Sequence, residues 1–227
     1  MVIYDVLYDF HSHTFHSDGA LSPLELIRRA AVNKYSAIGI TDHTGPGSLA
    51  RIIGEVSVDC ELARSKWDIV ALPGVELTHL PPAAIDDVAA RAKELGAWLV
   101  VVHGESPVEP VQEGTNLAAV KSRHVDILAH PGHMTQEVAE IAANNDVFIE
   151  ITTRRGHNTT NAHVAKIASR AGALMLLNSD THDEDDLLSD QLATDILHQA
   201  GINSRQYKQI LESNPLKLLQ RIKRLQP

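Results

Sequence analysis

The sequence predicts an α/β protein built around a parallel β-sheet that closes into a barrel. Short runs rich in Val, Ile and Leu alternate with stretches of helical periodicity along most of the chain. These runs are largely continuous in apolar residues, which is typical of strands covered by helices on both faces of a parallel sheet. About seven or eight such units allow a sheet to close into a barrel. An open doubly wound sheet is the alternative fold.

Seven apolar runs are the expected strands, and each leads into a polar turn. They are Val2–Phe10, Ala37–Thr41, Ile69–Val75, Ala97–Val102, Val125–Ala129, Val147–Thr152 and Ala173–Asn178.

The helices between these strands carry recognisable start and stop signals. Ser22 precedes Pro23 and is followed three residues later by Glu25, a capping-box pattern with proline at the first helical position. We therefore expect a helix over Ser22–Lys34. Similar signals, including glycine just beyond two of the ends, predict helices over Pro82–Leu95, Thr135–Asn145 and Thr160–Ala171.

The last part of the chain, Ser204–Leu225, has a different pattern from the repeating units. It predicts two short amphipathic helical segments broken at Asn214-Pro215. We expect this segment to form a closing helix against the barrel or a contact between two copies of the chain. A homo-oligomer through the C-terminal helices follows from the second alternative.

Composition limits the partners and the compartment. The chain has 227 residues, of which 44% are hydrophobic, enough for one sizeable core and a single domain. A net charge of −9 disfavours long nucleic acids as partners. No apolar run approaches the ~18 residues of a membrane span, and the N-terminus does not resemble a signal peptide. The single cysteine, Cys60, fits a reducing compartment and a structural role, so we expect a cytoplasmic protein without membrane contact.

The chain contains 13 histidines, and many of them follow the expected strands. Carboxyl ends of parallel strands meet at one edge of the sheet, and residues two apart share a face, so these side chains are expected to converge. Imidazole suits Zn and Fe, and carboxylates also suit Mn. Six histidines with three acidic residues are too many ligands for one ion, which predicts two or three divalent metals. The nine are His11, His13, Asp18, His43, Glu76, His103, His130, Asp180 and His182.

The same residues lie in motifs that resemble the signature of the polymerase and histidinol phosphatase (PHP) superfamily. The motifs are Asp9-Phe10-His11-Ser12-His13-Thr14 with Ser17-Asp18-Gly19, Ile40-Thr41-Asp42-His43, Pro73-Gly74-Val75-Glu76, His103, Ala129-His130-Pro131-Gly132 and Ser179-Asp180-Thr181-His182. The resemblance covers about residues 5–185. It implies a single PHP domain over residues 1–227, with a distorted (β/α)7 TIM-like barrel to about residue 202 and the helical segment beyond it.

The resemblance also implies a ligand set and an activity. One metal would be held by His11, His13, Glu76 and Asp180, a second by Glu76, His103 and His130, and a third by Asp18, His43 and His182. With every ligand position filled, we expect an active metal-dependent phosphoric ester hydrolase. It would hydrolyse a small phosphomonoester through a metal-activated water with no side-chain nucleophile, and a histidinol-phosphatase-like activity is one form of this.

Further polar residues near the same strand ends are candidates for substrate binding or for orienting the ligands. Arg154 and Arg155 follow the sixth strand, and a guanidinium group suits phosphate oxygens. His157, in the same loop, is a third candidate for substrate contact. Asp42, Glu105 and Glu150 are expected beside the ligands, and Glu105 begins a long loop that can cover the site.

Two other functions use the same residues. An exonuclease or oligonucleotide phosphodiesterase would need basic or aromatic walls for its substrate, but aromatic residues are only 4% of the chain. A non-catalytic metal-binding module, as in members of the superfamily attached to polymerases, ranks third because the ligand set is complete.

Overall fold

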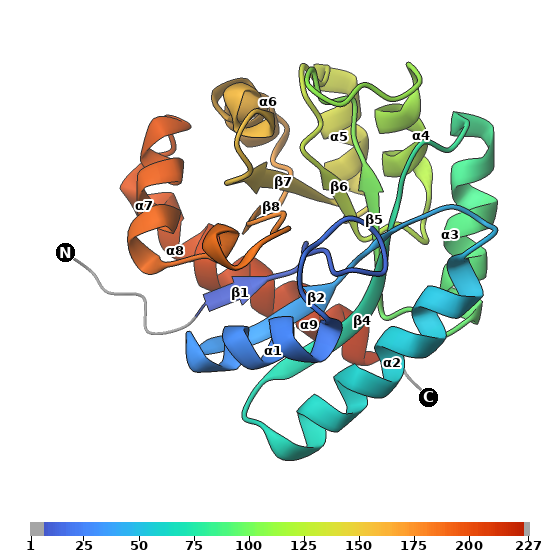
Figure 1. Ribbon diagram of the computed structural model, residues 1–227. Helices are drawn as coiled ribbons and strands as arrows, with labels where there is room; N and C mark the ends of the chain where they lie inside the picture. The colour runs from blue at the N-terminus through green and yellow to red at the C-terminus, as the bar shows by residue number, and fades with distance from the viewer. Residues whose placement is uncertain (1–6, 225–227) are drawn as a thin grey trace.

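Seven parallel strands wind into a nearly closed barrel in the computed structural model, which describes residues 7–224 (Figure 1). The strands pair in the order β1-β2-β4-β5-β6-β7-β8. Their bounds are β1 Leu7–Asp9, β2 Tyr35–Ile40, β4 Val70–Leu77, β5 Leu99–His103, β6 Ile127–Ala129, β7 Phe148–Thr152 and β8 Met175–Asn178.

All seven expected strands are confirmed, and the barrel is favoured over the open sheet. The start of the first expected strand, residues 2–6, lies outside the described residues. A further strand of two residues, β3 (His43–Thr44), was not expected and pairs with β4.

The barrel closes between β1 and β8 through backbone bonds just beyond the two strand ends. The amide of Asp180 donates to the carbonyl of His11 at 3.0 Å, and the amide of His13 donates to that of Thr181 at 2.8 Å. Three of these four residues were predicted as metal ligands. The closing seam of the barrel therefore also fixes part of the candidate site.

Helices cover the outside of the barrel (Figure 1). The bounds are α1 Pro23–Val32, α2 Leu49–Lys66, α3 Ile85–Glu94, α4 Thr115–Lys121, α5 Gln136–Asn144, α6 Asn161–Ala171, α7 Asp190–Gln199, α8 Ser204–Lys208 and α9 Asn214–Arg224, with short turns η1 Pro82–Ala84, η2 His157–Thr160, η3 Glu184–Asp186 and the π-helical η4 Gln209–Ser213.

The expected helix starts are confirmed where the sequence carried a cap. Ser22 accepts from the amide of Glu25 at 3.3 Å, and Thr135 accepts from that of Val138 at 3.3 Å. The sequence prediction did not delimit α2, α4 or α7. Helix α2 begins after Ser48 without a side-chain cap, which removes the usual start signal. It contains Cys60, whose burial raises the pKa of the thiol to about 12 and so keeps it unreactive.

Side chains on the inner face of the barrel change from apolar to polar along β4, β5 and β8. Leu99 and Val101 are packed in the barrel interior, and His103 follows on the same face two residues later. Likewise, Leu72 precedes Glu76 by four residues, and Leu176 precedes Asn178 by two. The strand periodicity that builds an apolar plug therefore carries polar side chains to the carboxyl end.

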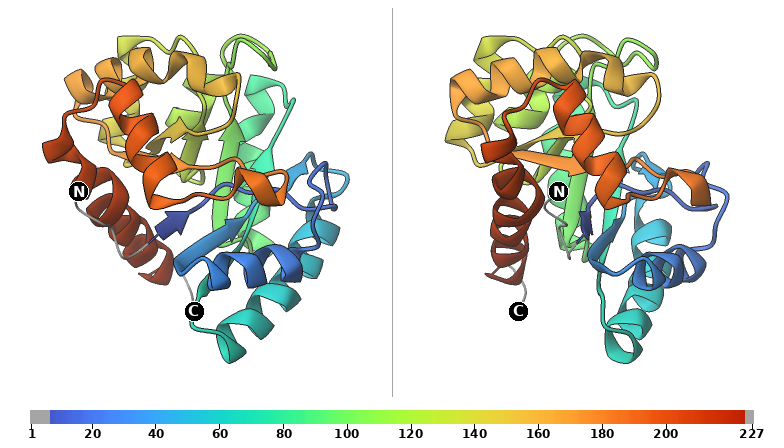
Figure 2. Two further views of the ribbon diagram at one scale, coloured as in Figure 1. Left: turned by 60° about the vertical axis from the view of Figure 1, so that its left-hand side comes forward. Right: turned by 90° about the vertical axis from the view of Figure 1, so that its left-hand side faces the viewer.

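The C-terminal segment closes the opposite end of the barrel. Leu218 and Ile222 of α9 join the interior cluster that contains Phe10 and Leu99, and Figure 2 shows α9 at the end of the barrel away from the loop that follows β1. The expected break at Asn214-Pro215 is wrong: η4 runs directly into α9, and the amide of Asn214 donates to the carbonyl of Gln209 just before Pro215. The contact between two copies stays a prediction.

In residues 7–224, every helix is too short or too polar to cross a bilayer.

Two leucines on α9 test this account of the closed end. Leu218 is fully buried, whereas Leu216 is 45% exposed on the same helix. We expect Leu218→Ala to lower the free energy of unfolding by about 2–5 kcal/mol because it leaves a cavity. The matched Leu216→Ala variant should stay within about 0.5 kcal/mol of the unaltered protein. Urea unfolding of the metal-free proteins measures both, and equal losses would contradict the closing role of α9.

Candidate metal centre

The structure brings all nine predicted ligands together at the carboxyl end of the barrel. Six are almost completely buried, with side-chain exposures of 0–4%. The other three lie nearer the surface: the side chains of His43 and His182 are 18% and 14% exposed, and that of Asp18 is 56% exposed. The group thus has a buried floor and an open side at Asp18.

Glu76 occupies the middle of the floor. Its carboxylate oxygens lie 3.3 Å from His11 Nε2, 2.6 Å from His43 Nδ1 and 3.3 Å from His103 Nδ1. His130 Nε2 lies 3.5 Å away and His13 Nε2 3.7 Å away. One buried carboxylate therefore faces five imidazoles that come from four different strand ends.

Asp180, which follows β8, is a second buried carboxylate in the floor of the group. Its Oδ1 atom lies 3.2 Å from His13 Nε2, and His13 Nε2 lies 3.0 Å from His11 Nε2. Ligand atoms that share a metal with bonds of about 2.0–2.2 Å lie roughly 3–3.6 Å apart in a tetrahedral site. Two of the three spacings therefore match a shared ion, and the third, from His11 Nε2 to Asp180 Oδ1, is slightly longer at 3.8 Å.

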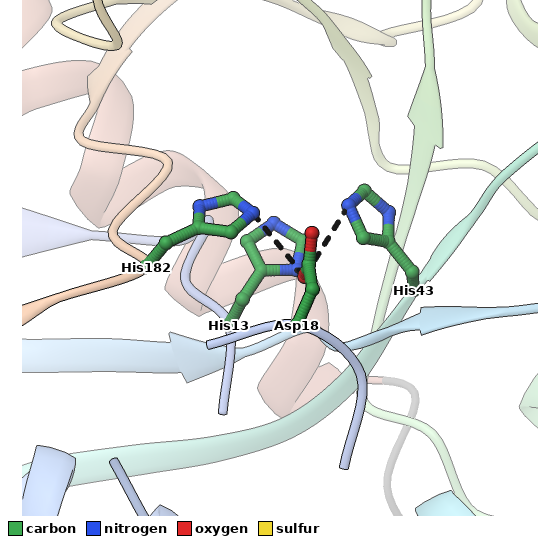
Figure 3. A group of neighbouring side chains, drawn as sticks. All are labelled: His13, Asp18, His43 and His182. Atoms are coloured by element: carbon green, nitrogen blue, oxygen red, sulfur yellow. Dashed lines mark ion pairs between the residues drawn. The ribbon is translucent and has the colours of Figure 1, made fainter. Parts of the chain in front are cut away.

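The open side is formed by His13, Asp18, His43 and His182. Figure 3 shows His182 and His43 on either side of Asp18, with His13 beside it. Asp18 Oδ1 lies 3.3 Å from His182 Nε2, 3.7 Å from His43 Nε2 and 4.0 Å from His13 Nδ1. These four side chains form a second group with the donor atoms of a metal site.

Two of the nine residues have left-handed backbone conformations. His130 has φ 24° and Asp180 has φ 55°, although neither is glycine. Such conformations cost free energy and persist where the surrounding structure fixes them, commonly at functional sites. In this chain they occur at the bends after β6 and β8, where His130 Nε2 lies 3.7 Å from Asp180 Oδ2.

Several buried polar atoms in the group lack a hydrogen-bond partner within the described part of the chain. They include both carboxylate oxygens of Glu76 and the Nδ1 atoms of His13, His103 and His130. An unsatisfied buried polar atom costs about 1–3 kcal/mol, and native structures contain few of them. Their concentration at one point fits a cation that binds their lone pairs, so these residues fit bound metal.

Neighbouring residues fix the orientation of the nine. Glu150, fully buried, lies with Oε2 2.8 Å from His11 Nδ1 and accepts from the side chain of Asn178 at 2.9 Å. A proton shared between Glu150 and His11 Nδ1 leaves the Nε2 atom free to bind metal. Asp42 accepts from the amides of Thr14 and Ser17 at 2.8 and 3.2 Å. It thereby holds the loop that carries His13 and Asp18, and its backbone carbonyl accepts from the amide of Glu76 at 3.1 Å.

The other expected residues occupy different places around the rim. Glu105 accepts from the amides of Gly114 and Asn116 at 3.0 and 2.9 Å, so it shapes the covering loop and the start of α4 instead of facing the ligands. Arg154 forms an ion pair with Asp186 at 2.9 Å. Arg155 is exposed and has no hydrogen bond or ion pair among residues 7–224. The third candidate for substrate contact, His157, is buried against His130, with ring centroids 4.3 Å apart.

Three residues at the site were not predicted from the sequence. Asn178 donates to Glu150, Thr78 lies 2.7 Å from His43 Nδ1, and a carboxylate oxygen of Glu109 lies within 4.8 Å of ligand atoms on His43 and His103. Asn178 had a signal, since it follows Leu176 by two residues on a buried strand. Glu109 had none, because its place depends on the path of the covering loop.

The two most buried carboxylates of the group are held in their ionised form by neighbouring imidazoles. Burial alone would raise the pKa of Glu76, but the charges of His11, His43 and His103 outweigh it and hold that pKa well below its ordinary value. Burial likewise opposes ionisation of Asp180, and nearby imidazoles again lower its pKa. Both carboxylates are therefore ionised at neutral pH and available to a cation.

A TIM-like barrel with a cluster of His and carboxylate side chains at its carboxyl end defines a barrel protein with a centre able to hold metal ions. No family model matches the chain. It is 48% identical over 216 residues to an uncharacterized protein of Methanocaldococcus jannaschii, covering 95% of this chain and 99% of that protein. It is 30% identical over 223 residues to a probable phosphatase of Shewanella halifaxensis, covering 86% and 84%.

Two solved structures share the fold. A chain of archaeal ribonuclease P, solved with mature tRNA, has a TM-score of 0.68 at 16% identity and covers 96% of this chain and 92% of its own. The histidinol phosphate phosphatase of Lactococcus lactis, solved with zinc, L-histidinol and phosphate, has a TM-score of 0.59 at 16% identity and covers 87% and 95%. The chain belongs to the PHP superfamily, as its motifs implied.

Metal binding should release protons, because the metal-free group holds some of them tightly. Burial lowers the pKa of His43, but the charge of Glu76 outweighs this and raises it to about 9. His43 is then protonated at neutral pH and must lose that proton to bind metal. We expect on the order of one proton or more to be released per protein at pH 7, measured by titration calorimetry in buffers of low and high ionisation enthalpy.

The sign of the pH dependence follows from the raised pKa. The ion pair of His43 with Glu76 stabilises the metal-free protein fully below the unfolded pKa of about 6.5. That contribution is lost as the pH rises through about 9. Proton release by His43 on metal binding should decline over the same upper range. A heat of binding at pH 7 that is independent of the buffer would contradict this assignment.

Proposed function

We propose that this protein is a metal-dependent phosphatase of a small phosphomonoester. The observation that carries the proposal is the convergence of nine His and carboxylate side chains at the carboxyl end of the barrel. Several of their buried nitrogen and oxygen atoms have no hydrogen-bond partner in the described chain. The name of the Shewanella relative and the phosphate and zinc bound by the Lactococcus enzyme support the same chemistry. Histidinol phosphate is one candidate substrate within this class.

We assign the nine residues to two or three Zn, Mn or Fe ions. His11, His13, Glu76 and Asp180 would hold one, with Glu76 shared by a second at His103 and His130. The open group of Asp18, His43 and His182 would hold the third. Bound metals supply an activated water and neutralise charge on the phosphoryl oxygens, so no side-chain nucleophile is required.

Side chains around the metals would position the substrate and the ligands. Arg155, exposed at the rim and without an ion-pair partner in the described chain, is suited to bind phosphate oxygens. Arg154 would contribute through the side of its guanidinium not bound to Asp186. Glu150 and Asp42 would act on catalysis by holding His11 and the loop of Asp18 in place.

An oligonucleotide phosphodiesterase is the second candidate. The observation that favours it is Phe15, which lies between His13 and Asp18 in sequence and is 57% exposed. An exposed aromatic ring beside a phosphate site can stack on a base. A small phosphomonoester remains first because the overall charge of −9 opposes a polyanionic substrate.

Elemental analysis and a substrate screen test the proposal together. The purified protein should contain Zn, Mn or Fe. With Mn added, it should hydrolyse members of a panel of histidinol phosphate, sugar phosphates, nucleotides and short oligonucleotides. Preference for oligonucleotides would reverse the order of the two candidates. Absence of any transition metal would contradict both.

Asp180→Ala should lower the phosphatase rate at least roughly a hundredfold, since even residues that only orient ligands are worth about 10–100-fold. Asp185→Ala is the matched control, because Asp185 is exposed in the same loop. It should keep the unaltered rate. An Asp180→Ala protein with full activity would show that hydrolysis does not depend on this centre.

A further inference from the structure

One expected strand end was left without a ligand by the sequence prediction. Six of the seven expected strands are followed by His, Asp or Glu residues of the predicted set, whereas β7 is followed by Thr153, Arg154 and Arg155. In the structure, the loop after β7 carries a histidine as well. His157 begins η2 and lies against the floor of the centre, 4.3 Å from His130 between ring centroids.

The loop that directs His157 inward is tightly built. Gly156 has φ 95°, a conformation that favours glycine and lets the chain reverse direction just before His157. The side chain of Asn161 donates to the carbonyl of Thr152 at 2.7 Å and accepts from its amide at 3.2 Å. The amide of Asn158 donates to the carbonyl of Arg154 at 3.0 Å. These bonds tie both ends of the turn to β7, so the inward position of His157 is set by the fold.

The imidazole of His157 is buried without a hydrogen-bond partner. The residue is 7% exposed, and its Nδ1 atom has none in the described residues. Its Nε2 atom lies 3.9 Å from Glu109 Oε2, which is too far for a hydrogen bond. A buried imidazole in this state is destabilising unless something else binds its lone pair.

The nearest polar atoms show what could bind it. His130, His157 and Asp180 are all buried, and each offers one ligand atom. These three atoms lie within 4.8 Å of one another. The rings of His103 and His157 lie with centroids 6.0 Å apart, and His103 and His130 also have unpartnered Nδ1 atoms. Converging imidazoles and a carboxylate are the donor set of a transition-metal site.

We propose that His157 is a tenth metal ligand, completing the coordination of the ion bound at His130. The inference rests on the proposed metal centre and extends it, because every strand of the barrel then contributes a ligand. A direct contact between His157 and the substrate is the competing role. Burial disfavours it, since the exposed Arg155 on the same loop is better placed to meet a ligand arriving from solvent.

Metal affinity of a His157→Asn variant tests the inference without relying on catalysis. We expect one metal equivalent to bind at least tenfold more weakly than in the unaltered protein, with the remaining equivalents unchanged. Competition with a chromogenic chelator gives the affinities, and the visible absorption of Co²⁺-loaded protein should change. The control is His163→Asn on α6, because His163 instead bonds the carbonyl of Met134 at 2.8 Å. It should match the unaltered protein.

The outcomes separate this inference from the proposed function. Unchanged affinities and Co²⁺ spectrum in His157→Asn, with a raised KM, would overturn the tenth ligand and assign His157 to the substrate. Absence of transition-metal binding by the unaltered protein would overturn the proposed function itself. Nitrogen NMR of the unaltered protein tests the inference even if the variant misfolds. The ring nitrogen resonances of His157 should shift when Zn²⁺ is added. Unshifted resonances at full loading would also overturn the inference.

Discussion

The buried carboxylate of Glu76 is the constraint on which the rest of the site depends. It is fully buried, lies within 4 Å of five imidazoles and has no well-oriented hydrogen bond among the described residues. An unpaired buried charge is very unfavourable, so the surrounding group must supply positive charge. Protons on the imidazoles do so in the metal-free protein, and divalent cations would do so in the loaded one. The same electrostatic requirement explains the raised pKa of His43 and the lowered pKa of Asp180.

The barrel brings positive charge to Glu76 because a layer of polar side chains lies directly above the apolar residues that fill its interior. Leu72 and Leu99 fill the interior, and Glu76 and His103 continue the same inner faces at the carboxyl end. α9 seals the other end with Leu218 and Ile222. Among the nine ligands in the described chain, Asp18, His43 and His182 have the most exposed side chains, and a substrate would approach from that side.

The strands and the clustered ligands were predictable because both follow from the local pattern of apolar and polar residues. Apolar runs located all seven strands, and the residues after them gave the nine clustered side chains. Side-chain directions in irregular loops were not predictable. Glu105 bonds the start of α4, Arg154 pairs with Asp186, and His157 folds back onto His130, and each outcome depends on contacts between segments distant in sequence. The continuous helix at Asn214-Pro215 required a π-helical turn that residue patterns do not signal.

Anomalous X-ray diffraction from crystals of the purified protein, collected at the absorption edge of the metal that elemental analysis finds, tests the central claim most directly. The account predicts two or three anomalous peaks at the carboxyl end of the barrel, each within bonding distance of His or carboxylate atoms of the nine residues, with one beside Glu76. Crystals of protein shown to contain metal that gave no peak there, or peaks only elsewhere on the molecule, would contradict it.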